Sequence, residues 1–271
     1  GITISSAGVV SGTTSDAPGN YPVTLRVTDS STGPGTYFEV ENYTLTVSAL
    51  PSLTINDVTL LEGNAGMTNF SFTVSLSAPA APGGVTFDIA TANGTATAGV
   101  DYVASSLTSQ TIPAGSSTYT FTVPVFGDLL NEPNENFFVN VTNVVNATVL
   151  DGQGLGTIAN DDPLPSLSIN DVAVAEGNSG TVNAVFTVTL SAASGQVVTV
   201  NYATADGTAT QSTDYISASG TLLFTPGQTA STFIVPVFGD TVPEANESFV
   251  VNLSGATNAV ISDNQGQGTI T

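Results

Sequence analysis

The sequence predicts an all-β protein built of tandem antiparallel β-sandwiches of immunoglobulin-like build, arranged end to end. Short stretches alternate apolar and polar residues with a period near two, which is typical of half-buried strands. Clusters of Gly, Pro, Asn and Asp punctuate these stretches. A long segment is also written twice, and no stretch shows helical periodicity with capping residues.

The repeat defines two domains. "PSLTINDVTLLEGNAG" at 51–66 returns as "PSLSINDVAVAEGNSG" at 165–180, 114 residues later. "PVFGDLLNEPNENFFVN" at 124–140 returns as "PVFGDTVPEANESFVVN" at 236–252, 112 residues later. The drift of two corresponds to two one-residue differences in length. We therefore expect a domain at 51–162 and a second at 163–271, with about seven strands in each.

Within each repeat the strands follow from the alternation. "NFSFTVSL" (69–76), "TYTFTVPVF" (118–126) and "ENFFVNVTNV" (135–144) each have a counterpart in the second repeat. The glycine-rich "GQGLG" (152–156) has no Lys and no following helix, so we expect it to let the last strand bend or bulge and not to bind phosphate. Tyr102 and its counterpart Tyr215 are expected to pack at the sandwich corner.

Residues 1–50 differ from the repeat. Strands are expected around 21–28 and 39–47, too few to close a sandwich. The pattern "SGT…Y…VTDS…YTLTV" resembles the C-terminal half of bacterial Ig-like modules of the putative-Ig or cadherin-like kind. We therefore expect neither end of the chain to be a natural domain boundary, with a longer molecule or head-to-tail completion between copies as the alternatives. Prolines in the linkers at 48–52 and 160–166 predict a rod.

Composition excludes most chemistries. The 271 residues carry a formal net charge of −21, with one Arg and no Lys, His, Cys or Trp. Schiff-base, histidine and thiolate catalysis are excluded, and so is nucleic-acid binding, which needs basic residues. No apolar run is long enough for a membrane span. A glycosidase with paired carboxylates stays as an alternative, and a hard cation with oxygen ligands is the natural partner.

Acidic residues gather at the ends of the expected strands, beside Gly and Pro, in the same register in both repeats. In the first repeat they are Glu62, Asp101, Asp128, Glu132, Glu135, Asp161 and Asp162. In the second repeat they are Glu176, Asp214, Asp240, Glu244 and Glu247. Acids that serve only solubility should be scattered over the strand faces. Crowded carboxylates repel, whereas Ca²⁺ accepts six to eight oxygens in a flexible geometry, so the clustering favours calcium over solubility and over Mg²⁺.

The same motifs resemble the Calx-beta domain: "EGN", "DGTATxxxDY", "GDxxxExxxE" before an aromatic strand, and a closing "NDD". The resemblance covers 51–162 and 163–271, and it implies calcium ligands at the twelve positions named above. Two departures stand out. Gly127 and Gly239 occupy positions where exchanger-type domains have acids, and the second repeat has no counterpart of Asp161 and Asp162. We therefore expect fewer or weaker ions, and a second site that is weak or empty.

The expected function is that of a calcium-binding structural and adhesive module, not an enzyme. It would belong to a secreted bacterial surface protein and act as a calcium-stiffened stalk or as part of an extracellular filament. The alternative is a non-catalytic accessory module of a large secreted enzyme. Besides calcium, the expected partners are neighbouring domains, copies of the same chain, and a cell-surface protein or glycan. We expect calcium to hold the two repeats at a fixed angle.

Overall fold

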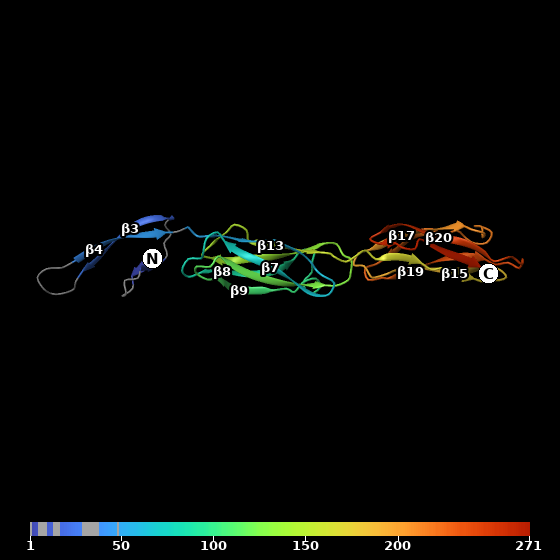
Figure 1. Cartoon of the computed structure of the whole chain (residues 1–271), viewed down its shortest axis with the longest axis horizontal. Helices are drawn as coiled ribbons and strands as arrows, with labels where there is room; N and C mark the ends of the chain where they lie inside the picture. The colour runs from blue at the N-terminus through green and yellow to red at the C-terminus, as the bar shows by residue number, and fades with distance from the viewer. Residues whose placement is uncertain (1, 5–9, 13–16, 29–37, 48) are drawn as a thin grey trace.

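The computed structural model describes residues 2–4, 10–12, 17–28, 38–47 and 49–271. Every helix or strand in these residues is a β-strand, which confirms the all-β prediction. Figure 1 shows an elongated molecule, with the N-terminal strands, a first sandwich and a second sandwich in a row along the long axis. Within the described ranges there is no helix long and apolar enough to cross a membrane.

The first sandwich packs two sheets, one of four strands in the order β10-β7-β5-β12 and one of five in the order β6-β13-β11-β8-β9. Most neighbours are antiparallel, but β12 pairs with β5 and β13 with β6 in parallel. The strands are β5 (Ser52–Ile55), β6 (Val58–Leu61), β7 (Gly66–Leu76), β8 (Val85–Asn93), β9 (Ser106–Ile112), β10 (Thr118–Gly127), β11 (Glu135–Val145), β12 (Thr148–Val149) and β13 (Gln153–Ala159).

The second sandwich repeats this topology, with sheets in the orders β19-β16-β14-β21 and β15-β22-β20-β17-β18. Its strands are β14 (Ser166–Ile169), β15 (Val172–Val174), β16 (Thr181–Leu190), β17 (Val198–Asp206), β18 (Ser219–Phe224), β19 (Ala230–Phe238), β20 (Glu247–Thr257), β21 (Val260–Ile261) and β22 (Gln265–Ile270). Each domain thus has nine strands, not about seven.

The extra strands arise partly because the first strand of each domain divides between the two sheets. In the first domain Asn56 and Asp57 separate β5 from β6. The side chain of Asn56 accepts a hydrogen bond from Thr73 N in one sheet, and Asp57 Oδ1 accepts one from Leu155 N in the other at 2.7 Å. Asx side chains that bond to the backbone favour such breaks in a strand. The second domain repeats the arrangement with Asn170 and Asp171.

The core lies between the two sheets of each domain and consists of the inward-facing residues of the alternating strands. In the first domain Phe70, Phe72 and Phe137 are fully buried. The ring of Tyr102 stacks on Phe137 with centroids 4.6 Å apart, and its hydroxyl donates to Asn93 Oδ1 at 2.6 Å. Tyr215 has the same position on Phe249, 4.5 Å away. The packing expected for both tyrosines is confirmed.

The glycines of "GQGLG" do not produce a bulge in the last strand, so the expected bulge was wrong, and the expected bend stays a prediction. The register of β13 against β11 runs without a shift. Gly154 and Gly156 are buried, and a Cβ at Gly156 would lie 2.5 Å from the ring of Phe137. Gly268 has the same relation to Phe249. These glycines make room for a core phenylalanine.

The N-terminal segment contains two strand pairs. β1 (Ile2–Ile4) pairs with β2 (Val10–Gly12), and β3 (Gly19–Thr28) pairs with β4 (Phe38–Val47), both antiparallel. The strands expected around 21–28 and 39–47 are confirmed. Much of the remaining segment, including 29–37, lies outside the described residues. Its assignment to half of an Ig-like module, and the exact domain limits, stay predictions.

Candidate metal centres

The acidic residues of the first domain meet at one end of the sandwich. Glu62 follows β6, and Asp161 and Asp162 follow β13. Because β6 and β13 pair in parallel, their ends lie side by side. The β8–β9 connection supplies Asp101 and the β10–β11 connection supplies Glu132 at the same end, where Glu135 begins β11. We call this end the first tip.

The first of two carboxylate groups at the first tip consists of Glu62, Asp161 and Asp162. One oxygen from each lies within 4.8 Å of the others. Glu62 is 7% exposed and Asp162 is 5% exposed. Both carboxylate oxygens of Asp162 are buried without a hydrogen-bond partner. Buried charges in proteins are paired or coordinate a metal. The Asp162 carboxylate has no such partner among the described residues, so a cation is expected beside it.

The second group consists of Asp101, Glu132 and Glu135, again with one oxygen from each within 4.8 Å of the others. The turn at 97–101 fixes Asp101, whose Oδ2 accepts a hydrogen bond from Thr97 N at 2.7 Å. The backbone of Glu132 is held by Asn160 Oδ1, which accepts from Glu132 N at 3.0 Å. The two groups together offer six carboxylates on a partly buried surface.

Four of these carboxyls, those of Glu62, Glu132, Glu135 and Asp162, have raised pKa values. Burial, and then the charge of Asp128, raise the pKa of Glu62 to about 7. Burial and the neighbouring Asp101 raise that of Glu135 to about 7. The pKa values of Glu132 and Asp162 are raised by burial first and by neighbouring acids second. Without a cation the first tip is therefore an unfavourable place for negative charge.

Asp128 lies in neither group. Its Oδ1 accepts a hydrogen bond from Leu130 N at 2.7 Å, which shapes the start of the β10–β11 loop. Its charge still acts on the first tip, because it contributes to the raised pKa values of Glu62, Glu132 and Asp162.

Gly127 explains one departure from the exchanger-type pattern. A Cβ at this position would overlap the carbonyl oxygen of Gly63 and come within 2.8 Å of that of Glu62. Gly239 stands in the same relation to Glu176 and Gly177. An acid cannot replace glycine here without moving the segment that carries the first glutamate of the site.

Two asparagines at the first tip were not among the predicted site residues. Asn160 Nδ2 and Asn131 Nδ2 both donate to Asp162 O, at 3.0 Å and 2.7 Å. Asn131 also contacts Ser194 and Gln196 of the second domain. A signal for Asn131 exists in the sequence, since the second repeat has Pro243 at the matching position.

The second tip, the corresponding end of the second domain, has one carboxylate group. Asp214, Glu244 and Glu247 each offer an oxygen within 4.8 Å of the others. The pKa values of Glu244 and Glu247 are raised by desolvation and by neighbouring acids, first among them Asp240 for Glu244 and Asp214 for Glu247.

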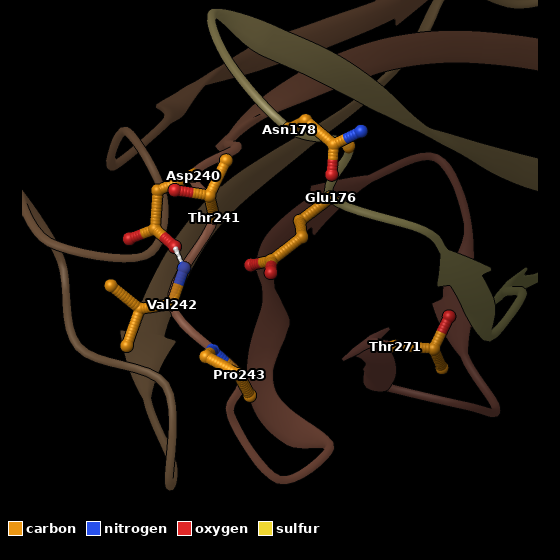
Figure 2. Close-up of a pocket in the computed structure, with 8 residues that line it drawn as sticks. Glu176, Asn178, Asp240, Thr241, Val242, Pro243 and Thr271 are labelled. Atoms are coloured by element: carbon orange, nitrogen blue, oxygen red, sulfur yellow. Dashed lines mark hydrogen bonds between the residues drawn. The ribbon is translucent and has the colours of Figure 1, made fainter.

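Glu176 and Asp240 lie outside this group and line a pocket of about 290 Å³ with Asn178, Val242 and Thr271. Figure 2 shows the Glu176 carboxylate extending into the space beside the Asp240–Pro243 loop, where Asp240 Oδ1 accepts from Val242 N at 2.6 Å. The second tip therefore has the same loop as the first and the same group of three carboxylates, with Glu176 outside it.

A family model described as the Calx-beta domain matches residues 55–162 and again 159–270. The chain belongs to the Calx-beta family. The two adjacent matches make it a tandem of two Calx-beta domains, as the sequence predicted. The first match covers the first sandwich from the last residue of β5 onward, and the second covers all strands of the second sandwich.

Solved structures with similarity to the chain include tandem domains. CBD12 from CALX1.2 is 21% identical over 79% of this chain and 83% of its own, with a TM-score of 0.38. The calcium binding domain CBD12 of CALX1.1 is 20% identical over 75% and 79%, with a TM-score of 0.37. The apo form of the Calx CBD1 domain is 25% identical over 40% and 96%, with a TM-score of 0.35. Family membership rests on the family model, because these scores are low.

The structure brings nine of the twelve predicted site residues into three groups of three, and Asp128, Glu176 and Asp240 lie outside them. That these residues bind a metal stays a prediction. The donor set fits a hard cation, because all the side-chain donors are carboxylate oxygens and the Asp162 carboxylate has no other partner.

Proposed function

We propose that the chain is a calcium-binding structural module, with Glu62, Asp161 and Asp162 holding one ion at the first tip and Asp101, Glu132 and Glu135 a second. The observation that carries this proposal is the buried Asp162 carboxylate, which has no hydrogen-bond partner and faces two further acids. The chain has one Arg and no Lys or His to neutralise it.

Calcium fits this donor set better than magnesium. Ca²⁺ takes six to eight oxygens in a flexible geometry, and carboxylates that reach the ion from separate strands and loops suit it. Mg²⁺ requires a near-octahedral arrangement and keeps several of its waters. The printed title of the CALX1.1 structure, a calcium binding domain, supports the same choice for this member of the family.

The elongated arrangement of the domains supports a mechanical role (Figure 1). We propose that the chain is a segment of a secreted bacterial surface protein, a stalk or extracellular filament. In it bound calcium stiffens the end of the first domain where the linker leaves, since Asp161 and Asp162 are themselves linker residues. We propose no catalytic activity, because the chain has none of the His, Lys or Cys residues on which most hydrolytic and transfer chemistry depends.

Titration calorimetry combined with thermal unfolding tests the calcium proposal. Calcium should release or absorb heat on binding the full chain, and magnesium should bind more weakly. Ligand bound only by the folded state stabilises it by about 2.7 kcal/mol at a hundredfold excess over Kd. The first domain should therefore melt at a higher temperature in calcium than in chelator. Absence of heat, together with identical melting curves in calcium and in chelator, would contradict the proposal.

A further inference from the structure

The contact between the two domains is built on an uncharged side chain. Asn131 lies in the β10–β11 loop of the first domain, between Asp128 and Glu132, and is 7% exposed. It faces the β16–β17 loop of the second domain, where Ser194 is 2% exposed. These are two of the four buried polar or charged side chains in the described residues, together with Glu62 and Asp162.

Asn131 takes part in four hydrogen bonds that join three parts of the chain. Its carbonyl oxygen accepts from Gly195 N and from Ser194 Oγ, both at 3.2 Å. Its side-chain Oδ1 accepts from Gln196 Nε2 at 3.0 Å, and its Nδ2 donates to the linker carbonyl of Asp162 at 2.7 Å. None of these bonds uses a carboxylate oxygen.

The segment of the second domain that contacts Asn131, Ser194–Gln196, is held in place by hydrogen bonds within its own domain. Ser194 O accepts a hydrogen bond from Gly227 N at 3.0 Å, which ties the β16–β17 loop to the β18–β19 turn. Ser194 Oγ accepts from Gln196 N at 3.0 Å. The Ser194–Gln196 segment is therefore organised by its own domain, and little conformational freedom is lost when it meets Asn131.

The contact is also specific to this junction. The second repeat has Pro243 where the first has Asn131, so its loop offers neither a side-chain amide nor a backbone N–H at that position. The first domain has Ala80, Ala81 and Pro82 where the second has Ser194, Gly195 and Gln196. In the repeat alignment, the two complementary halves occur together only where the first domain meets the second.

We propose that Asn131 and the Ser194–Gln196 segment form a recognition pair that sets the orientation of the second domain on the first, with or without a bound cation. Each hydrogen bond of this kind contributes only modestly to stability, but four of them at one contact fix a single orientation, and any other close packing of the domains would leave buried polar groups without partners. No carboxylate oxygen takes part in them, so neither protonation of the neighbouring acids nor the binding of a cation removes a donor or an acceptor. Calcium then acts on the stability of the first tip, while the recognition pair sets the angle.

This proposal does not rest on calcium binding, and it differs from the expectation that calcium fixes the angle. The chain has no cysteine, so a pair of labels can be introduced without other changes. Thr122→Cys on β10 and Leu223→Cys on β18 place a spin label on an exposed position of each domain. Pulsed electron paramagnetic resonance of the full chain then gives the distribution of distances between the domains, in calcium and in chelator.

We expect one narrow distribution for the labelled parent chain, at the same distance in calcium and in chelator. Asn131→Pro, the residue of the second repeat, and Gln196→Ala, in the other domain, should each lose the narrow peak in chelator. Leu129→Thr is the matched control, because it also introduces the residue of the second repeat, at an exposed loop position, and it should keep the peak.

Two results would overturn the proposal. One is a broad distribution for the parent chain in chelator that becomes narrow only in calcium, which would assign the orientation to the ion. The other is a narrow peak that survives in both Asn131→Pro and Gln196→Ala. Circular dichroism melting of each variant verifies that both domains are folded. Failure of calcium to bind would leave the expected result in chelator unchanged, so the two proposals fail separately.

Discussion

The two tips carry nearly the same loop and place it in different surroundings. At the first tip six carboxylates form two groups, Asp162 is buried, and the second domain lies against Asn131. At the second tip three carboxylates form one group, while Glu176 and Asp240 line a pocket of about 290 Å³. The acidic motif is the same at both tips, but the segments packed around it determine how deeply its carboxylates are buried.

The residues that the two tips share show what the surroundings change. Asp101, Glu132 and Glu135 group in the same way as their counterparts Asp214, Glu244 and Glu247, but Glu132 is partly buried beside Gly195 of the second domain, whereas Glu244 is exposed. Glu62 and its counterpart Glu176 both follow a strand that pairs in parallel with the last strand of its domain. Glu62 is 7% exposed, whereas Glu176 is partly exposed and lines the pocket of the second tip. Covering segments bring carboxylates together and bury them, and both effects raise pKa values.

The largest effect is expected at a feature that both tips share, the close approach of a glycine to the backbone carbonyls of the opposite segment. Gly127→Ala and Gly239→Ala should each destabilise their own domain by about 1–3 kcal/mol, because the added methyl group overlaps a backbone carbonyl that cannot move freely. Differential scanning calorimetry of the full chain should show one transition lowered in each variant. Gly19→Ala on β3, where the atom nearest to the added Cβ lies 3.6 Å away and φ is not positive, is the control for the loss of a glycine alone. Two glycine variants no less stable than this control would argue against the close approach.

The second prediction concerns Asp162, the buried acid of the first tip. Asp162→Asn should stabilise the calcium-free first domain by about 1–3 kcal/mol, because it removes a buried charge without a partner. The same substitution removes a ligand, so the gain in melting temperature on adding calcium should shrink. The exposed Asp151, whose Oδ1 accepts from Gln153 N at 3.2 Å, provides the control Asp151→Asn. A variant that is less stable in chelator and keeps the full calcium response would refute the role given to Asp162.

The third prediction is a difference in pH dependence between the domains. Glu62 and Glu135 have folded-state pKa values of about 7 against an ordinary 4.5, so the folded chain holds more protons than the unfolded chain between these values. The free energy of unfolding of the calcium-free first domain should therefore fall as pH rises from about 4.5 to 7 and level off above that. Saturating calcium should reduce the fall, since the ion binds the deprotonated groups.

The second domain is the internal comparison for this pH effect. At its tip the carboxyl pKa values of Glu244 and Glu247 are raised, and Glu244 is exposed. Its melting transition in chelator should move less between pH 5 and pH 8. Equal shifts for the two domains would mean that burial at the first tip has no consequence for stability.

The smallest effect is expected from exchanging Asn93 and Asp206. Asn93 Oδ1 accepts hydrogen bonds from Ala98 N and Tyr102 Oη, and Asp206 Oδ1 accepts from Gln211 N and Tyr215 Oη. Because an oxygen plays the same part in both domains, Asn93→Asp and Asp206→Asn should each change stability by no more than about 0.5 kcal/mol. Chemical denaturation resolves this. A loss comparable with that of the glycine variants would show that the charge of Asp206 matters to its corner.

Much of the fold could be predicted because the repeat and the period-two alternation are local signals. The motif "INDV" was visible in both repeats, but the break in the strand that it causes could not be predicted. The break depends on hydrogen bonds from Thr73 N to Asn56 and from Leu155 N to Asp57, and these two partners lie in different sheets. The glycines before and after Leu155 were misinterpreted for the same reason. The group that excludes a Cβ at Gly156 is Phe137, on a neighbouring strand.

The acidic residues of the site could be predicted because strand ends beside Gly and Pro are recognisable in sequence. Their division into groups could not, because it depends on the parallel pairing of β6 with β13, which places Glu62 beside Asp161 and Asp162. Asn131 was missed because the search was for charged ligands, and the one signal in the sequence, Pro243 at the matching position of the second repeat, does not say what Asn131 contacts. Its partners, Ser194 and Gln196, lie more than sixty residues away in the next domain.

The parallel pairing of β6 with β13 also determines how the rod responds to tension. The chain enters the first domain through β5 and β6 and leaves it through β13, and both paired strands run toward the first tip. A pull on the two linkers therefore drags β6 and β13 in opposite directions along their length. The four residue pairs from Val58–Gly156 to Leu61–Ala159 are loaded together, as a shear clamp, and do not open one at a time as a hairpin does.

The second domain repeats the clamp with three pairs, from Val172–Gly268 to Val174–Ile270. Resistance to force is then governed by the rate of unfolding, which this geometry slows, and less by equilibrium stability.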